Sequence, residues 1–389
     1  MARGIPAYVN HRMLAWARET AGIDRADVAH HLQTTTDRIV AWENGNELPT
    51  MRQARILASL YKRPLSLFYF DDPPIEPPRP TDFRVTGRRE EGDFPPALRF
   101  AIRDAYNRRE DATRLLRALG LTAKPFDLGV SLSEKADVVG ERMRKWANLT
   151  IDEQSKCSEP RVLYNLVRQK LEQNGILTFQ MSGIPDETAS GFSIAETPLP
   201  VISVNSGANP VRRLFTLFHE LVHIALQQGG VCDLSSIDGS ARKPRVEEFC
   251  NRVAGAVLVP REALLSHPIV KGHVGNRPWV QNQIVQLAAQ FCVSKYVMLI
   301  RLRAVKKATE AYCSQMLSEY RKQEGIESPA ASFVRVHDKV ASVNGRLFTR
   351  LVLDSYFNEQ ISLVELSNLL DLNLEYLDRL ADKIYREAS

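Results

Sequence analysis

The sequence predicts a mainly helical α+β protein, with a helical bundle at each end and a small antiparallel sheet between them. Three observations lead to this fold class. Apolar residues recur at helical spacing along most of the chain. Three short apolar or alternating runs, at residues 176–180, 191–194 and 201–205, are instead typical of strands. Helical patterns flank these runs on both sides, so we expect helices packed against one small sheet.

Length and composition are those of an ordinary globular protein. The 389 residues are 44% hydrophobic and 25% charged, which suggests two or three domains with a sizeable core. The net charge of +5 permits contact with nucleic acid without arguing for it. Five scattered cysteines without a C-x-x-C pair fit a reducing compartment and argue against a disulfide framework. Without an apolar leader or a long apolar run, we expect a cytoplasmic protein with no membrane partner.

Residues 1–70 predict short helices that pack as a helix-turn-helix domain. The third helix of such a domain enters the major groove of DNA. Here it would present Thr36, Asp37 and Ala41, with Arg38 as its one cation. An aspartate in the groove is repelled by phosphate, and no second base-reading side chain is present. DNA binding through residues 25–45 and recognition of a protein by the same module therefore both stay open.

Residues 71–95 are predicted to be a linker, because five prolines fall within residues 71–80 and keep the chain extended. Residues 96–160 are then expected to form a helical connector. Its first helix carries a row of arginines. A charge row of this kind is usually a solvated face, and contact with nucleic acid is the alternative.

The residues that indicate a catalytic function lie in a helix predicted over residues 209–230. An asparagine and a proline are expected to begin this helix, and two glycines are expected to end it. His219 and His223 are four residues apart, so their imidazoles lie on one side of this helix. Together with Glu220 they form the H-E-x-x-H arrangement of zinc peptidases. In that arrangement the histidines bind Zn²⁺ and the glutamate takes a proton from water. We therefore predict one Zn²⁺ per chain, with Glu220 as the catalytic base.

A catalytic zinc site needs a third protein ligand and leaves the fourth position to water. A metzincin would place a third histidine six residues after His223, but a glycine stands there, so that subclass is excluded. The helix predicted over residues 246–257 supplies a carboxylate instead. Glu247 lies at the border of its apolar face, whereas Glu248 points further toward solvent. Glu247 is favoured as the metal ligand over Glu248, and over loop aspartates 233 and 238.

Several short sequence motifs occur together between residues 175 and 260. They are Gly175-Ile176, Gly191-Phe192-Ser193, residues 200–205, residues 213–223, residues 247–254 and Leu258-Val259-Pro260. In combination they resemble the ImmA/IrrE metallopeptidase family, and residues 40–50 are similar to the end of an XRE-type helix-turn-helix domain. The resemblance implies a gluzincin-like site in a peptidase core at residues 161–262. There His219, His223 and the glutamate of the second motif bind zinc, and Glu220 acts as general base.

Residues 263–389 are predicted to be helical. The segment 279–305 resembles the tail that follows the peptidase core in the family, and we expect it to cover that core. Further on, Ser362 and Glu365 form a capping box. The acidic side chains of this last bundle favour contact with a protein, or a homodimer, over contact with DNA.

The function implied by the resemblance is a regulatory endopeptidase that cleaves a repressor or antitoxin-like protein in a stress or mobile-element response. The first alternative is a DNA-binding transcriptional regulator whose peptidase-like domain senses zinc or is only structured by it. A second is a binding module that holds no metal.

Overall fold

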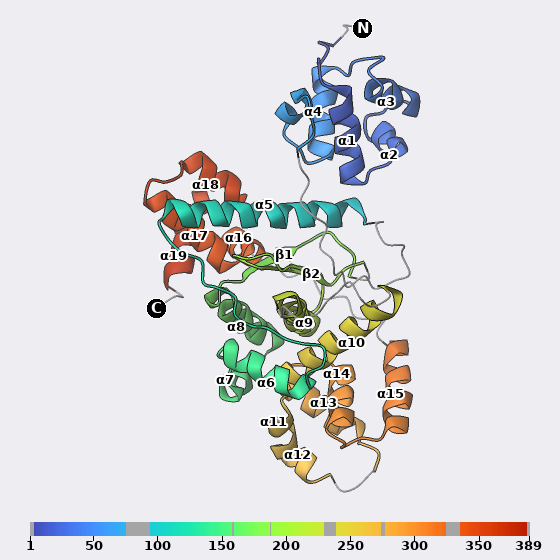
Figure 1. Cartoon of the computed structure of the whole chain (residues 1–389), viewed down its shortest axis with the longest axis vertical. Helices are drawn as coiled ribbons and strands as arrows, with labels where there is room; N and C mark the ends of the chain where they lie inside the picture. The colour runs from blue at the N-terminus through green and yellow to red at the C-terminus, as the bar shows by residue number, and fades with distance from the viewer. Residues whose placement is uncertain are drawn as a thin grey trace. The chain divides into compact units, whose positions relative to one another are not determined.

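The computed structural model describes residues 4–74, 94–157, 159–186, 188–228, 239–273, 277–323 and 335–386. The chain divides into two compact units (Figure 1). The first comprises Met1–Arg79 and Gly87–Tyr106, and the second comprises Pro80–Thr86 and Asn107–Ser389. Each unit is described by itself below.

The first unit is built from short, well-capped helices. Asn10, Thr35 and Thr50 each accept a backbone N–H at the start of a helix, which satisfies a donor that the helix leaves unpaired. The helices lie where the sequence predicts them, whereas the helix-turn-helix identity of the unit stays a prediction. Their bounds are α1 (His11–Ala21), α2 (Arg25–His31), α3 (Thr36–Glu43), α4 (Met51–Leu60), η1 (Leu65–Tyr69) and the first part of α5 (Pro96–Ala118).

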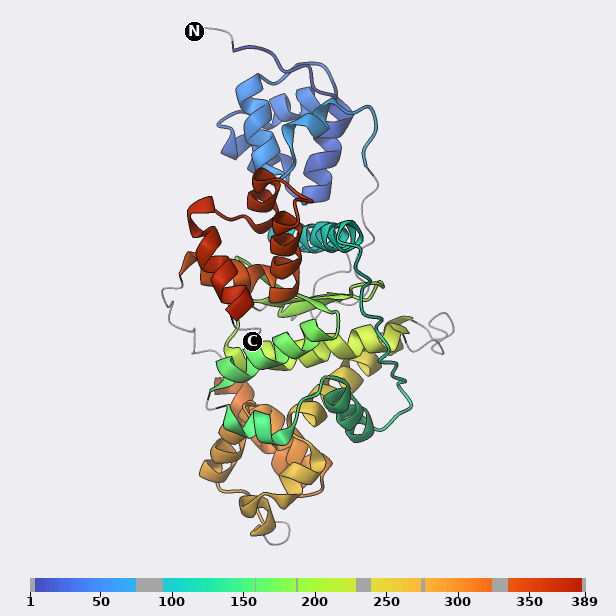
Figure 2. The ribbon, with the colours of Figure 1, turned by 90° about the vertical axis from the view of Figure 1, so that its left-hand side faces the viewer.

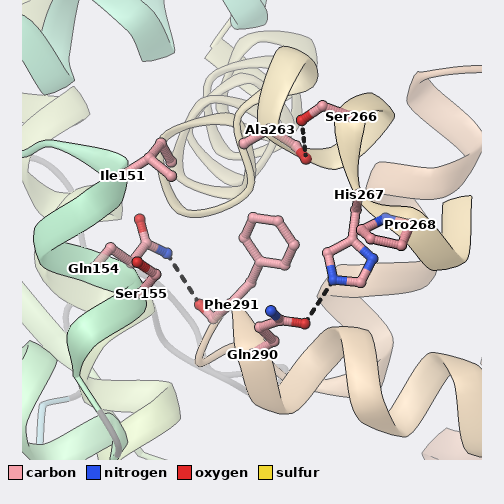
Figure 3. A pocket seen from close by; sticks show the side chains of 9 residues that line it. All are labelled: Ile151, Gln154, Ser155, Ala263, Ser266, His267, Pro268, Gln290 and Phe291. Atoms are coloured by element: carbon pink, nitrogen blue, oxygen red, sulfur yellow. Dashed lines mark hydrogen bonds between the residues drawn. The ribbon is translucent and has the colours of Figure 1, made fainter. Parts of the chain in front are cut away.

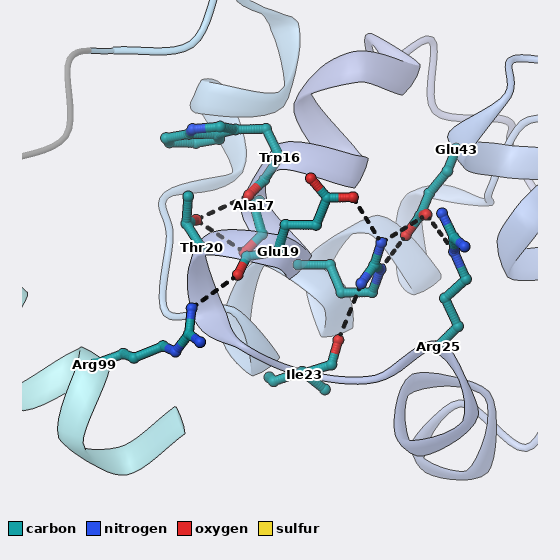
Figure 4. Close-up of polar contacts among 9 residues, drawn as sticks. Trp16, Ala17, Glu19, Thr20, Ile23, Arg25, Glu43 and Arg99 are labelled. Carbon is teal, nitrogen blue, oxygen red and sulfur yellow. Dashed lines mark hydrogen bonds and ion pairs between the residues drawn. The ribbon is translucent and has the colours of Figure 1, made fainter. Parts of the chain in front are cut away.

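A buried carboxylate ties these helices together (Figure 4). Glu43, at the end of α3, lies 2.6 Å from Nε of Arg18 on α1 and 2.8 Å from Nε of Arg25 on α2. Arg18 also donates to the carbonyl oxygen of Ile23. Because a buried charge is tolerated only when it is paired, this network fixes how α1, α2 and α3 pack.

The second unit places its strands among many helices (Figures 1 and 2). The strands are β1 (Leu177–Met181), β2 (Gly191–Ile194) and β3 (Val201–Asn205). Helices α6 (Ala136–Trp146), α7 (Ile151–Lys156) and α8 (Pro160–Gln173) precede them. The helices that follow are α9 (Pro210–Gln228), α10 (Gly239–Leu258), α11 (Arg261–Ser266), α12 (Pro268–Lys271), α13 (Gln281–Gln290), α14 (Lys295–Ala304), α15 (Glu310–Gln323), α16 (Val336–Asn344), α17 (Arg346–Phe357), α18 (Leu363–Leu370), η2 (Leu374–Tyr376) and α19 (Leu377–Arg386).

The sheet is mixed, which corrects the antiparallel sheet expected from the sequence. Its strand order is β1-β3-β2. β2 pairs antiparallel with β3, and β1 pairs parallel with β3. The chain reverses direction once between β1 and β2 and again before β3, so β3 runs the same way as β1. A fully antiparallel sheet would need β2 in the middle, and it is β3 that lies there.

All positions in the three strands are buried, so helices cover both faces of the sheet. Both views place α9 on one side of the sheet and α16 and α17 on the other (Figures 1 and 2). β2 and β3 contact α9, which in turn packs against α10. α9, which carries the two predicted histidine ligands, therefore lies directly against the sheet, and α10, which carries Glu247, packs on α9.

Helices α13 and α14 belong to the same hydrophobic core as α9 and α10. Leu287 and Leu299 are fully buried in it, which confirms the expectation that residues 279–305 cover the core. In the described part of the chain no single helix is long and apolar enough to cross a membrane. The bent pair α13 and α14, at 97° to each other, passes that test of length and composition only when its two helices are taken together.

Most arginines of the α5 row are used in contacts inside each unit, so the solvated face that the sequence suggested is limited to Arg114 and Arg117, which are exposed. These contacts are Arg99 to the Glu19 carbonyl and Arg103 to the Lys62 carbonyl in the first unit, and Arg109 to Glu196 and Arg114 to Glu365 in the second. Guanidinium groups held by carbonyls and carboxylates are poorly placed to bind phosphate. This face gives no support to contact with nucleic acid.

Candidate metal centre

The structure brings together the three side chains that the sequence predicts as metal ligands. His219 and His223 lie on α9 and are buried to within 2% of their surface, and Glu247 reaches them from α10. The two Nε2 atoms are 3.1 Å apart. Glu247 places one carboxylate oxygen 3.2 Å from His219 Nε2 and the other 3.2 Å from His223 Nε2.

Local sequence explains why α9 presents its histidines inward. Asn209 Oδ1 accepts the N–H of Arg212 at 2.9 Å, so the predicted N-cap forms and Pro210 is the first helical residue. Leu217 and Leu221 lie on the same apolar side of α9 and are fully buried. That burial sets the rotation of the helix, and the two histidines one turn apart face α10.

The competing carboxylate is placed elsewhere. Glu248 is exposed and lies 3.8 Å from Arg252 on its own helix. Asp233 and Asp238, the loop candidates, fall outside the described residues. Among the described carboxylates that the sequence offered as a ligand, Glu247 is the one that meets both histidines.

The donor set fits a divalent metal ion. Two ligands bound tetrahedrally at about 2.0–2.1 Å from one Zn²⁺ lie roughly 3.3 Å apart, close to the 3.1 and 3.2 Å separations seen here. Burial opposes ionisation of Glu247, but its hydrogen bonds with His219 and His223 outweigh that effect and lower its pKa. The carboxylate is therefore ionised at neutral pH, as a metal ligand must be.

Glu220 is buried beside this cluster and has a partner that the sequence analysis did not assign. Ser193 on β2 donates its hydroxyl to Glu220 Oε2 at 2.9 Å. Gly191 allows this approach, because a Cβ there would lie 2.5 Å from Thr216 Cγ2 and 2.9 Å from the Ser203 carbonyl oxygen. The Gly-Phe-Ser run predicts that the glycine and the serine share one face of the strand, since alternate strand residues face the same side. The sequence could not show that this face meets Glu220.

Two further residues of α10, Asn251 and Cys250, belong to the surroundings of the histidines. Asn251 Oδ1 lies 3.1 Å from His219 Nδ1. Cys250, the neighbouring residue, is fully buried; burial raises the pKa of its thiol, and His223 offsets only part of that rise. Neither residue was predicted as part of the site, although both share a helical face with Glu247.

The C-terminal end of α10 is firmly anchored. Its last carbonyl groups would otherwise lack partners. Arg144 donates to the Val257 carbonyl at 2.8 Å, and Gln154 donates to the Leu258 carbonyl at 2.8 Å. Burial lowers the pKa of Arg144 to about 10, so it still carries its charge at neutral pH. These bonds hold in place the helix that carries Glu247.

Gln154 also lines a small pocket of about 260 Å³ away from the metal ligands (Figure 3). The other lining side chains come from α7, from the α11–α12 region and from the end of α13. His267 Nε2 lies 2.6 Å from Gln290 Oε1, and Gln154 donates to the carbonyl of Phe291. The polar groups of this wall are thus mainly bonded to one another.

In the first unit, helix α3 exposes Thr36, Asp37 and Arg38 as predicted, whereas Ala41, which was also expected to be presented, is half-buried. The guanidinium of Arg38 lies 5.6 Å from the ring centroid of Trp42 and 3.5 Å from a carboxylate oxygen of Glu47. The one cation of this helix is therefore already engaged within its own unit.

A helix-borne pair of histidines joined by a carboxylate from the next helix, able to hold a metal ion, defines a metallopeptidase-like site. Residues 171–303 match the family model Peptidase_M78, described as an IrrE N-terminal-like domain. The matched segment contains the sheet, α9 and α10, and it supports an ImmA/IrrE-type peptidase. A search of curated proteins found no match.

Proposed function

We propose that this protein is a zinc-dependent endopeptidase that acts in regulation, with a repressor or antitoxin-like protein as its substrate. One observation carries the proposal: His219, His223 and Glu247 converge within hydrogen-bond distance, inside the segment that matches a peptidase family. A stress or mobile-element response is the setting that fits a peptidase of this kind.

In this proposal each residue has a defined task. His219, His223 and Glu247 would hold Zn²⁺, which supplies the Lewis-acid chemistry of the class. Glu220 takes the proton of the attacking water and later delivers it to the leaving amine. Its hydrogen bond from Ser193 fixes the carboxylate in one orientation. The low exposure of Glu220 keeps bulk water away from the proton transfer.

The sheet suggests how the substrate is held. β2 carries Ser193 and, within the described part of the chain, pairs with a strand along one side only, that of β3. An edge strand can bind an extended peptide through main-chain hydrogen bonds. β1, the other edge, contacts α16 and α17. We therefore assign the substrate chain to the β2 edge, next to Glu220.

For the first unit we propose recognition of a protein, either the substrate or a second copy, as the main role. Arg38 is engaged with Trp42 and Glu47, and Asp37 disfavours phosphate. A mobility-shift assay with wild type and Arg38→Ala examines the DNA alternative. Binding that is specific for one sequence and lost in the variant would replace our proposal for this unit.

The metal site is tested first by the zinc content of purified protein. We expect about one zinc per chain in wild type and in the matched control Glu248→Gln. The expected result for His223→Ala is loss of the metal, and Glu247→Gln should bind it weakly. No zinc in wild type, even after it is supplied, would exclude the enzyme and favour a binding module.

Cleavage is tested separately, because the substrate can be found without a guess. Cells that produce wild type or Glu220→Gln are compared by sequencing all protein N-termini. New N-termini in one protein, present with wild type and absent with Glu220→Gln, are the expected result. Identical N-termini in both, with zinc bound, would leave a metal-binding regulator in place of a peptidase.

A further inference from the structure

The face of α10 that meets α9 carries Glu247, Cys250 and Asn251, which are spaced by three and four residues and so lie side by side. Glu247 contacts the Nε2 atoms of both histidines. Asn251 reaches the other ring nitrogen of His219, Nδ1, at 3.1 Å. Cys250, between Glu247 and Asn251 in sequence, is fully buried. One helix face therefore supplies a metal ligand, Glu247, and also Asn251, the partner that lies behind the imidazole of His219.

The chemistry of imidazole makes the Asn251 contact informative. A neutral imidazole has a proton on one nitrogen and a lone pair on the other. Nε2 of His219 faces His223 and Glu247, so this nitrogen must keep its lone pair if a metal is to bind. The carbonyl oxygen of Asn251 can only accept a hydrogen bond. It therefore requires the proton of His219 to sit on Nδ1.

We propose that Asn251 is a positioning residue for the metal centre: its carbonyl fixes the tautomer and ring plane of His219 and thereby sets the metal affinity. This inference rests on the proposed zinc site. It extends that proposal because it assigns a task to a side chain that touches no metal. Partners behind a ligating histidine typically change metal affinity by about 10–100-fold.

The side chain at position 251 is an amide and not a carboxylate, and this difference affects the metal affinity. A carboxylate at this position would accept the Nδ1–H bond more strongly, because charge-assisted hydrogen bonds are stronger than neutral ones. It would also make the ligand more basic. Asn251 therefore orients His219 while holding the affinity below the value that an aspartate would give. Since Asn251 and Glu247 are four residues apart on α10, ligand and orienting group move as one body.

The test measures Zn²⁺ affinity by competition with a chromophoric chelator, and site geometry by the visible spectrum of the Co²⁺-loaded protein. Asn251→Leu removes the acceptor and should weaken Zn²⁺ binding by about 10–100-fold and alter the Co²⁺ spectrum. Asn251→Asp has nearly the same shape and should bind Zn²⁺ at least as tightly as wild type. Glu248→Gln, on the same helix and exposed, should match wild type.

The outcomes separate this inference from the proposed function. If wild type binds no metal, the proposed function fails. If wild type binds Zn²⁺ and Asn251→Leu binds it within twofold, the site stands and the role of Asn251 is wrong. Weakening by Asn251→Asp to the level of Asn251→Leu would also overturn it, because only packing would then explain the loss. Thermal unfolding of the metal-free variants shows whether each one folds.

Discussion

Replacing Glu172 by alanine should loosen the packing of α17 against α8 and the sheet. Glu172 is a buried residue of α8, and its Oε2 accepts the backbone N–H groups of Arg346 and Leu347 at 3.0 and 3.2 Å. These N–H groups open α17. The residue before them, Gly345, has no side chain to cap the helix. Glu172 therefore acts as an N-cap supplied by a distant part of the chain.

The magnitude follows from the bonds that are lost. An N-cap contributes about 1–2 kcal/mol. The further hydrogen bond from the Thr178 hydroxyl to the other carboxylate oxygen contributes about 1 kcal/mol. Arg168 keeps its bond to the Thr178 carbonyl, so it is not left without a partner. We expect the free energy of unfolding of the second unit to fall by about 2–3 kcal/mol, or roughly 4–8 °C in Tm.

Calorimetry measures the loss, and hydrogen exchange locates it. The amides of Arg346 and Leu347 should exchange faster in Glu172→Ala than in wild type, because they lose their acceptor. Glu172→Gln keeps one acceptor oxygen and should lie between the two. Gln173→Ala changes the next, exposed residue of α8 and should stay within about 0.5 kcal/mol of wild type. If Glu172→Ala unfolds like this control, the capping argument is wrong.

Three more predictions follow from single contacts. Gly345→Ala should destabilise the second unit, because φ is +72° and an added Cβ would overlap the Thr178 carbonyl oxygen; a thermal melt equal to wild type would contradict this. Gly191→Ala should leave zinc binding intact but lower the cleavage rate, because β2 must move away from α9; an unchanged rate would show that this packing is not needed. The hydrogen bond from Lys170 lowers the pKa of Glu153 to about 2, so the stability it adds is present above about pH 4.5 and is lost as pH falls toward 2. The stability difference between wild type and Lys170→Met in urea should shrink over that range, and a constant difference would argue against the pairing.

Much of the local structure could be predicted from the sequence. Periodicity and caps placed most of the longer helices, and two of the three strands have the predicted bounds. The spacing of His219 and His223 is enough to put both on one side of a helix. The border position of Glu247 on its helix was enough to favour it over Glu248. These features depend on a few neighbouring residues, and helical and strand geometry are nearly the same in every protein.

The contacts between distant segments were decided only by the tertiary structure. The sequence could not show that β3 lies in the middle of the sheet, that Ser193 meets Glu220, or that Asn251 lies behind His219. Nor could it show that Glu172 caps a helix that begins more than 170 residues later. The physical reason is that a local pattern defines which face of an element is buried, whereas its partner depends on how all elements pack together. The sequence by itself therefore determined the residue types of the candidate metal site and their spacing, and the packing of α9, α10 and β2 determined how those residues are oriented.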